Sequence, residues 1–292
     1  MQPDRIAELL APFLTASTCS SAHCHSEERS DEESAVLAPA QLQSISTYID
    51  ILQRWNARVN LTSIRDEEQI ITRHFGESLF AARHLFPSLG DAGTAAPGWP
   101  GRASDSAAEA ASAAEWRKSA VPGIDATAER RERAVDGASR GIAPSGEPAA
   151  EQRKRITAAD LGSGAGFPGI PIKLWAPHIS LTLIESNHKK ATFLREVVRA
   201  LTLTDVDIQN VRAESLPDES FDIVTLRAVE RFETILPIAN ALLAPGGRLA
   251  LLIGASQLPS AQALLPALNW SIPLPIPNST SRILTVATDV WQ

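Results

Sequence analysis

The sequence predicts an α/β protein in which a doubly wound parallel sheet follows an N-terminal helical extension. From Ile156 onward, short apolar runs alternate with segments of helical periodicity over about 135 residues. Residues 40–87 show helical periodicity alone. Strand-helix alternation of this kind is typical of three layers, with helices on both faces of one sheet.

Composition narrows the function classes. The chain has 292 residues, 44% of them hydrophobic, and a formal net charge of -7. This charge argues against bulk attraction to a polyanion, although a local basic patch would be enough for binding. No apolar run is long enough to cross a bilayer, and the first residues lack a basic start. We therefore expect no signal peptide, no membrane contact and a cytoplasmic location.

Two polar segments interrupt the pattern of a folded domain. Residues 15–37 are rich in Ser and acids, and residues 91–155 are dominated by Ala, Gly, Ser, Pro, Glu and Arg. Both are typical of disordered or weakly helical insertions. The expected organisation is a helical region at 1–90, an insertion at 91–155 and a catalytic domain at 156–292.

The N-terminal region contains two predicted helices. In "QLQSISTYIDILQRWN", Leu42, Ile45, Ile49 and Leu52 recur at spacings of three and four and form one apolar face. The second helix begins at the acids 66–68, which suit a helix N-terminus, and ends before a proline at position 87.

The remaining elements follow in order from Ile156. The predicted strands are 156–161, 180–186, 205–214, 221–228, 247–254 and 281–289, and the predicted helices are 169–175, 189–201 and 232–244. We expect the "PGG" sequence that follows to end the last of these helices.

The glycine-rich segment "DLGSGAGFPG" follows the first strand of the predicted sheet. In such a sheet the ligand lies at the carboxyl ends of the strands, and glycines allow the backbone to approach it closely. A dinucleotide site needs G-x-G-x-x-G, but Phe167 occupies the third glycine position after Gly162 and Gly164. A phosphate-binding G-K-[ST] sequence is also missing.

S-adenosylmethionine is the alternative ligand. It carries no phosphate, so a tight helix cap is not required, but its ribose needs an acid at the end of the second strand. Glu185 stands 23 residues after Gly162, which suits that position in either cofactor class.

Three separated motifs together resemble one family. "DLGSGAGFPGIPIKL", "LIESNHKKATFLREV" and "RWNARVNLTSIRD…RHFGES" are similar to the bacterial ribosomal RNA small-subunit methyltransferase G family, over residues 40–87 and 156 to about 290. The resemblance implies a class I methyltransferase fold with a seven-stranded sheet. It also implies methyl transfer from S-adenosylmethionine to N7 of a guanine in 16S rRNA of the small ribosomal subunit.

The resemblance also suggests site residues. The positions that match the family's cofactor site are Asp160, Gly162, Gly164, Phe167, Glu185, Ala213, Glu214 and Arg227. Ala213 and Glu214 match the pair that flanks the adenine. The chain departs from the family pattern at three positions: Leu226 replaces a usual serine, Glu77 a common aspartate and Ile253 a frequent lysine. The change at Ile253 puts one RNA contact in doubt.

The implied chemistry needs few catalytic groups. Guanine N7 has a lone pair and no proton, so no general base is required and alignment is the main task. Arg227 is the expected catalytic residue, which would hold the methionine end of the cofactor or donate to guanine O6. A strand-end ion pair is the alternative role for this arginine.

Other motifs allow two interpretations each. Trp55 favours packing over base stacking, and His74 is either a local partner or a site residue. An RNA-facing basic patch is the alternative to a solvated helix face for Arg54, Arg58, Arg65, Arg73, Lys189, Lys190, Arg195 and Arg199. The cluster "CSSAHCH" does not have the spacing of a zinc module, so no metal is expected.

Two rival functions remain open at this stage. One is a class I methyltransferase that acts on another nucleic acid or a small molecule, and the other is a noncatalytic ribosome-assembly factor. The sequence does not distinguish naked RNA from an assembled subunit as the substrate.

Overall fold

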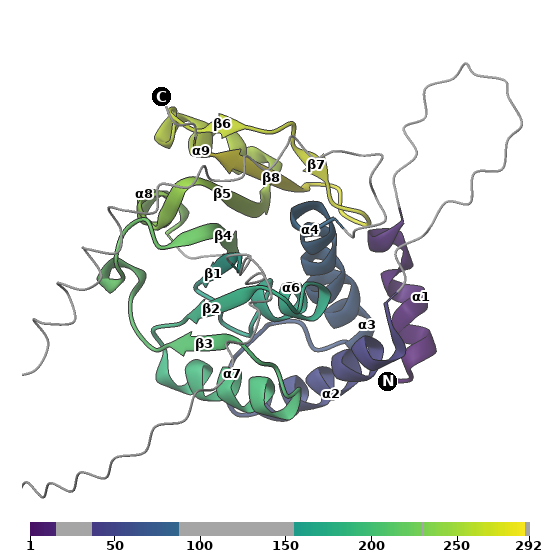
Figure 1. The fold of residues 1–292 in the computed structure, drawn as a ribbon. Helices are drawn as coiled ribbons and strands as arrows, with labels where there is room; N and C mark the ends of the chain where they lie inside the picture. Colours follow the sequence, from purple (N-terminus) through teal and green to yellow (C-terminus); the bar gives the residue numbers. More distant parts are fainter. Residues whose placement is uncertain (16–36, 88–154, 229–230, 290–292) are drawn as a thin grey trace, which may run out of the picture. The chain divides into compact units, whose positions relative to one another are not determined.

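An eight-stranded mixed sheet forms the centre of the computed structural model (Figure 1), which describes residues 1–15, 37–87, 155–228 and 231–289. The strand order is β3-β2-β1-β4-β5-β8-β6, with β7 also paired to β8. The strands are β1 Thr157–Leu161, β2 Ser180–Ile184, β3 Val206–Gln209, β4 Phe221–Arg227, β5 Leu243–Gly254, β6 Asn269–Trp270, β7 Leu274–Pro275 and β8 Arg282–Thr288.

The order of the strands confirms the predicted doubly wound α/β fold. Strands β1 to β5 are parallel, and chain order reverses between β1 and β4, so the carboxyl ends of these strands flank the crevice where such folds bind ligands. The expected sheet was parallel and had seven strands, whereas the observed sheet is mixed and has eight. The two short strands β6 and β7 were not predicted from the sequence. Strand β8 runs antiparallel to β5. Apolar periodicity identifies a strand but carries no information on its direction.

Helices cover both faces of the sheet. They are α6 Gly169–Trp175, α7 His188–Ala200, α8 Phe232–Ala241 and α9 Leu258–Leu264, with short 3-10 turns η2 Ala213–Ser215 and η3 Ala255–Gln257. Helices α6 and α7 pack with Ala158 and Ile223 on one face, whereas α8 and α9 pack with Ala159 and Val224 on the other. This alternation produces the three predicted layers.

Two predicted boundaries are wrong. Helix α8 ends at Ala241, and the "PGG" sequence lies within β5, where Gly246 has φ +72° and the β4–β5 register shifts. A Cβ on Gly247 would lie 2.6 Å from the Ala244 carbonyl oxygen, so the chain turns too tightly there for another residue. Strand β3 is also shorter than expected, because residues 213–215 form η2.

The N-terminal extension packs on the α6 and α7 side of the sheet. It contains α1 Pro3–Leu14, α2 Pro39–Asn56, α3 Glu67–Gln69, the π-helix η1 Ile70–Gly76 and α4 Glu77–Leu85. Helix α4 contacts α6 and β5, and α2 runs beside α7 (Figure 1). The π-helix, which the sequence pattern did not indicate, is a form often found at functional sites.

Gly76 closes the π-helix against α1. A Cβ on this glycine would lie 2.6 Å from the ring of Phe13, which is only 1% exposed. The close approach of α1 to the π-helix therefore requires glycine.

We expect Gly76→Ala to lower the free energy of unfolding by about 1–3 kcal/mol, because the Phe13 ring must move. Gly254→Ala is the matched control, since its Cβ would have no contact closer than 3.5 Å. Its effect should stay within about 0.5 kcal/mol. Urea denaturation measures both, and equal losses would contradict the packing argument.

Candidate functional site

The glycine loop connects β1 to α6 at the carboxyl edge of the sheet. Gly162, Gly164 and Gly166 have φ values of +68°, +55° and +84°, a backbone region that other residues adopt only under strain. The amides of Gly162 and Ser163 donate to the Ile184 carbonyl oxygen at 2.9 and 3.1 Å, which anchors the loop to the end of β2.

The loop glycines have different roles. A Cβ on Gly166 would collide with the hydroxyl of Tyr48, whereas a Cβ on Gly164 would meet only the Gly162 carbonyl oxygen, at 3.6 Å. Gly164 therefore faces open space, and Gly166 serves packing. At Gly169 a Cβ would lie 2.6 Å from Leu183, so this glycine allows the close helix-strand contact that a dinucleotide site would assign to the Phe167 position.

Two buried carboxylates, Glu185 and Asp160, accept hydrogen bonds from backbone amides in and next to the loop. Glu185 accepts from the amides of Gly164 and Asn187 at 2.9 and 2.7 Å. Asp160 accepts from the Gly169 amide and the Thr225 hydroxyl, both at 3.1 Å. Burial raises the pKa of Asp160 to about 7, although these hydrogen bonds oppose the shift.

Phe167 lies in an aromatic cluster with the N-terminal helices. Its ring stacks on Tyr48 and His74, with centroids 5.3 and 4.8 Å apart, and meets Phe75 edge-on at 5.0 Å. Only 5% of Phe167 is exposed. Because the side chain is buried, the predicted contact between Phe167 and a cofactor would have to be made by its backbone.

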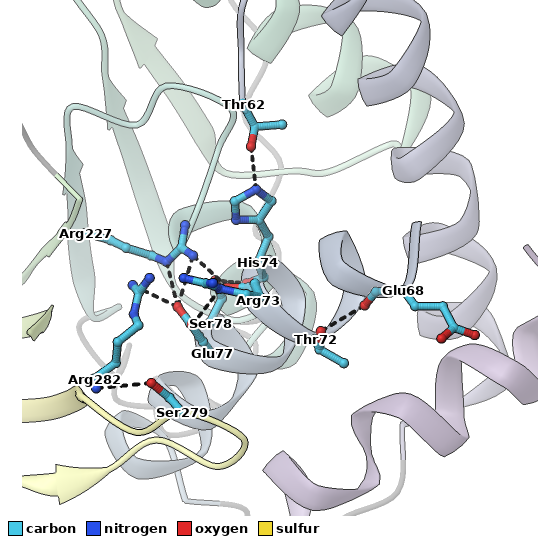
Figure 2. Close-up of polar contacts among 10 residues, drawn as sticks. All are labelled: Thr62, Glu68, Thr72, Arg73, His74, Glu77, Ser78, Arg227, Ser279 and Arg282. Carbon is cyan, nitrogen blue, oxygen red and sulfur yellow. Dashed lines mark hydrogen bonds and ion pairs between the residues drawn. The ribbon is translucent and has the colours of Figure 1, made fainter. Parts of the chain in front are cut away.

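Glu77 is the meeting point of three arginines (Figure 2). Its Oε2 atom accepts from Nε and Nη2 of Arg227 at 3.2 and 3.0 Å and pairs with Nη2 of Arg282 at 2.9 Å. Arg73 pairs with the other carboxylate oxygen at 3.9 Å, and its carbonyl accepts from Arg227 Nη2 at 2.6 Å. The Glu77 side chain is 3% exposed. The four residues come from η1, α4, β4 and β8.

This arginine–glutamate cluster (Arg73, Glu77, Arg227 and Arg282) carries excess positive charge. Three guanidinium groups, which stay protonated, face a single carboxylate. Burial lowers the pKa of Arg282, and the nearby Arg227 and Arg73 contribute to the lowering, against the carboxylate of Glu77. Such a cluster favours a ligand that brings negative charge or hydrogen-bond acceptors.

His74 links the N-terminal motif to the glycine loop. The Asn56 side chain accepts from the amides of Leu61 and Thr62, which fixes the turn before the π-helix. The Thr62 hydroxyl then lies 2.8 Å from His74 Nε2, while Nδ1 is buried with no hydrogen-bond partner among the described residues. Burial lowers the pKa of His74 to about 3, and the charges of the three arginines add to this effect.

Two adjoining cavities lie beyond the ends of β4 and β5. The smaller, of about 170 Å³, is lined by Ala228, Phe232, Leu252, Ile253, Gly254, Gln257 and Arg282. The larger, of about 500 Å³, is lined by Arg231, Phe232, Glu233, Thr234, Ser256, Gln257 and Ser260. Ile253, which replaces the family lysine, thus borders a cavity.

The structure brings most of the predicted site residues to one edge of the sheet. Asp160 lies near the end of β1 and the loop glycines follow that strand, Glu185 follows β2, and Arg227 ends β4, the neighbour of β1. Ala213 packs in the apolar cluster that includes Leu161 and Ile184, whereas Glu214 is exposed.

The sequence did not identify Arg282 or Tyr48 as site residues. Arg282 lies outside the quoted motifs. Tyr48 lies on the apolar face of α2, and its hydroxyl donates to the Ala165 carbonyl oxygen. In the sequence, the one sign of a role was a polar group next to apolar residues: the Tyr48 hydroxyl among the apolar positions of its helix, and Arg282 just before an apolar strand.

The remaining motifs are only partly described. Trp55 is half-buried, donates to Glu196 at 2.9 Å and packs edge-on against Phe193, as the packing interpretation predicts. Of the proposed basic patch, Arg73 belongs to the arginine–glutamate cluster, whereas Arg195 and Arg199 are exposed on α7. The "CSSAHCH" cluster and most of both predicted insertions lie outside the described residues.

The glycine loop fits a cofactor that has no phosphate. Gly164 faces open space that a ligand can occupy, and the Glu185 carboxylate beside it would repel a phosphate group. Together with the strand order, this defines the fold and site of a class I methyltransferase. Within the described ranges, no helix has the length and apolar character needed to cross a bilayer.

Comparison with known proteins identifies the family. The model of the rRNA small subunit methyltransferase G family matches residues 41–101 and 146–268. A relative from Halorhodospira halophila, named ribosomal RNA small subunit methyltransferase G, is 32% identical over 217 residues, which are 74% of this chain and 71% of the relative. Relatives of the same name from Chloroflexus aggregans and Xylella fastidiosa are 29% and 30% identical, over 87% and 80% of this chain and 84% and 80% of their own lengths. The chain belongs to the rRNA small subunit methyltransferase G family.

The buried His74 predicts a pH-dependent stability. Its folded pKa of about 3 lies below the ordinary 6.5, so its contribution is complete above pH 6.5 and is lost as pH falls toward 3. The loss should approach about 1.4 kcal/mol per pH unit within this window. His74→Gln removes it, so the stability difference between wild type and variant should shrink as pH falls. Asp160 titrates in both proteins, so its contribution to the free energy of unfolding cancels in the difference between them.

Urea denaturation at several pH values between 4 and 7 measures this difference. His188→Gln, at an exposed histidine of α7, supplies the baseline. A difference between wild type and His74→Gln that stays constant with pH would show that His74 does not titrate as its burial requires.

Proposed function

We propose that this chain transfers a methyl group from S-adenosylmethionine to N7 of a guanine in 16S rRNA of the small ribosomal subunit. The observation that carries the proposal is the arrangement of three neighbouring strand ends: the open Gly164 loop after β1 is bonded to Glu185 after β2, and Arg227 ends β4 on the other side of β1. Membership of the family supplies the class of acceptor. An RNA substrate of this kind implies that the reaction takes place in the cytoplasm.

The cofactor would lie across the ends of β1, β2 and β3. Its proposed contacts are Asp160, Gly162, Gly164, Phe167 through its backbone, Glu185, Ala213, Glu214 and Arg227. Support comes from the open space at Gly164 and from Glu185, whose carboxylate accepts the Gly164 amide of the loop and the Asn187 amide before α7. S-adenosylmethionine supplies a methyl group on a positively charged sulfur.

The reaction needs alignment rather than proton transfer. The N7 lone pair forms the new bond to the methyl carbon, and the electron pair of the broken C–S bond stays on sulfur. The positive charge moves from sulfur to the purine, and no proton is transferred. The groups bonded to Arg227 suit this requirement, because they are a carboxylate that stays paired and a backbone carbonyl, and the nearby His74 stays neutral at physiological pH. Asp160, with a pKa of about 7, is bonded to the Gly169 amide and the Thr225 hydroxyl, and the proposed reaction does not use its proton.

Arg227 is the proposed positioning residue. Its side chain is 7% exposed, and Glu77 and the Arg73 carbonyl fix its Nε and Nη2 atoms. A guanidinium held in this way can orient the methionine end of the cofactor or the guanine without changing its own conformation.

Gly164→Ala should weaken binding of S-adenosylmethionine roughly tenfold or more, because its Cβ would occupy the open side of the loop. Gly246→Ala is the matched control, since Gly246 also has a positive φ but lies within β5, away from the glycine loop. Both variants should lose about 1–2 kcal/mol of stability from backbone strain. Calorimetric titration separates them, and equal affinities would rule out the proposed approach of the cofactor.

Arg227→Ala should lower methyl transfer by about 10²-fold, as expected for the loss of a positioning contact. Arg227→Lys keeps the charge but not the planar fork and should recover only part of the rate. Arg5→Ala, on the exposed face of α1, is the control. The assay follows labelled methyl groups into unmodified small subunits and naked 16S rRNA, with cofactor affinity measured in parallel. Unchanged turnover and affinity in Arg227→Ala would exclude the role.

The same assay tests the proposed function itself. Label in 16S rRNA at guanine N7 supports it, and the comparison of subunits with naked RNA identifies the substrate form. Cofactor binding without label in the RNA would indicate a different acceptor, and absence of cofactor binding would indicate a noncatalytic assembly factor.

A further inference from the structure

The smaller of the two cavities has an unusual combination of walls. Leu252 and Ile253 supply an apolar surface, and the half-buried ring of Phe232 borders it and the larger cavity. Its volume of about 170 Å³ has room for roughly five or six water molecules, which is the scale of one nucleobase rather than a whole nucleotide.

The polar groups of this cavity are hydrogen-bond donors. Among the described residues that line it, Arg282 is the charged one, and a guanidinium has no acceptor. Gln257 uses its side-chain oxygen to accept from the Gly254 amide at 3.0 Å, so the amino group of its amide remains. Both side chains therefore suit a base edge that presents an acceptor.

Arg282 is held in position but retains donors. Its Nη2 atom pairs with Glu77 at 2.9 Å, and 19% of its side chain is exposed beside the cavity that it lines. Arg227 differs, because both its Nε and Nη2 are bonded and it lines neither cavity. Figure 2 shows Arg227 and Arg282 on the same Glu77 carboxylate, and of these two only Arg282 lines the cavity, so it is the better placed to contact a base.

We infer that the smaller cavity receives the target guanine and that Arg282, by donating to guanine O6, determines the specificity for this base. The inference rests on the proposed function, which it deepens by assigning the acceptor site. Enzymes that modify a base commonly take it out of the stack into a fitted pocket and hold it by stacking and edge contacts. Phe232 supplies the stacking surface, and Arg227 is left to position the cofactor.

The chemistry at position 6 explains the choice between purines. Guanine presents an O6 acceptor there, whereas adenine presents an amino donor, which a guanidinium cannot satisfy. Contact through O6 alone leaves N7 free to accept the methyl group.

The larger cavity suits the neighbouring nucleotides. It contains the cation Arg231 and the hydroxyls of Thr234, Ser256 and Ser260. Glu233, the acid among its described lining residues, accepts from the Ser260 hydroxyl at 3.1 Å. It shares Phe232 and Gln257 with the smaller cavity, so a strand that places one base in the smaller cavity would continue through the larger one.

The test is a change of base preference in Arg282→Gln. A glutamine amide can donate to O6 or accept from the adenine amino group, so it should relax the choice. Small subunits are reconstituted with guanine or adenine at the methylated position, and methyl transfer to each is measured. We expect wild type to require guanine. In Arg282→Gln, transfer to guanine should fall at least tenfold, and the adenine-to-guanine ratio should rise at least tenfold.

Two further variants distinguish an effect on base recognition from an effect on folding. Arg231→Gln, which changes only the larger cavity, should raise KM for subunits without changing the base ratio. Phe232→Leu should weaken both bases alike. An Arg282→Gln protein that loses activity but keeps the wild-type ratio would overturn the inference, because a purely structural role lowers transfer to both bases equally.

Binding of nucleosides makes the outcome independent of the ribosomal substrate. Guanosine and adenosine are titrated into protein saturated with S-adenosylhomocysteine, which occupies the cofactor site and prevents adenosine from binding there. A guanosine preference in wild type that is lost in Arg282→Gln supports the inference, even if no label enters the subunits and the proposed function fails. Equal binding of both nucleosides to wild type would overturn the inference, even if the subunits are methylated.

Discussion

The buried carboxylate of Glu77 joins parts of the chain that are far apart in sequence. It lies at the start of α4 and pairs with Arg227 at the end of β4 and Arg282 at the start of β8. Removal of one partner from a buried ion pair typically costs about 3–5 kcal/mol, because a charge is left without compensation. The N-terminal extension is thus part of the site, since it supplies the anion that holds the two arginines of the sheet in place.

A second connection runs from the same extension to the glycine loop. Tyr48 on α2 bonds to the Ala165 carbonyl oxygen and stacks on Phe167, and His74 covers the other side of that ring. Aromatic pairs of this kind add about 0.5–1.5 kcal/mol each beyond the area they bury. Phe167, which argues against a dinucleotide site in the sequence, is therefore the residue through which the N-terminal helices contact and stabilise the glycine loop.

The sequence predicted those features of the fold and site that depend on local spacing. The apolar periodicity located the helices and strands, and the separation of Gly162 from Glu185 predicted that the glycine loop and this acid lie at the ends of adjacent strands, as β1 and β2 place them. Features that depend on long-range packing were not predictable in this way. The antiparallel direction of β8 brings Arg282 to the carboxyl end of β4, and nothing in the periodicity of residues 281–289 indicates that direction. The π-helix was missed for a related reason, because its extra residue per turn is stabilised by packing against α1 rather than by its own sequence.

The electrostatics of the site are consistent with a reaction that moves no proton. Burial and three neighbouring cations keep His74 neutral, and the arginines remain charged at any physiological pH. Asp160, with a pKa of about 7, is bonded to the Gly169 amide and the Thr225 hydroxyl beside the glycine loop. Around the proposed acceptor the charges are those of the arginines and Glu77, and what the structure controls there is geometry. In the proposed site Glu77 would provide that control, because it pairs with Arg227 at the end of β4 and with Arg282, which borders the base-sized cavity. A single buried carboxylate can thereby fix the distance between the methyl donor and its acceptor, which is the quantity on which an in-line transfer chiefly depends.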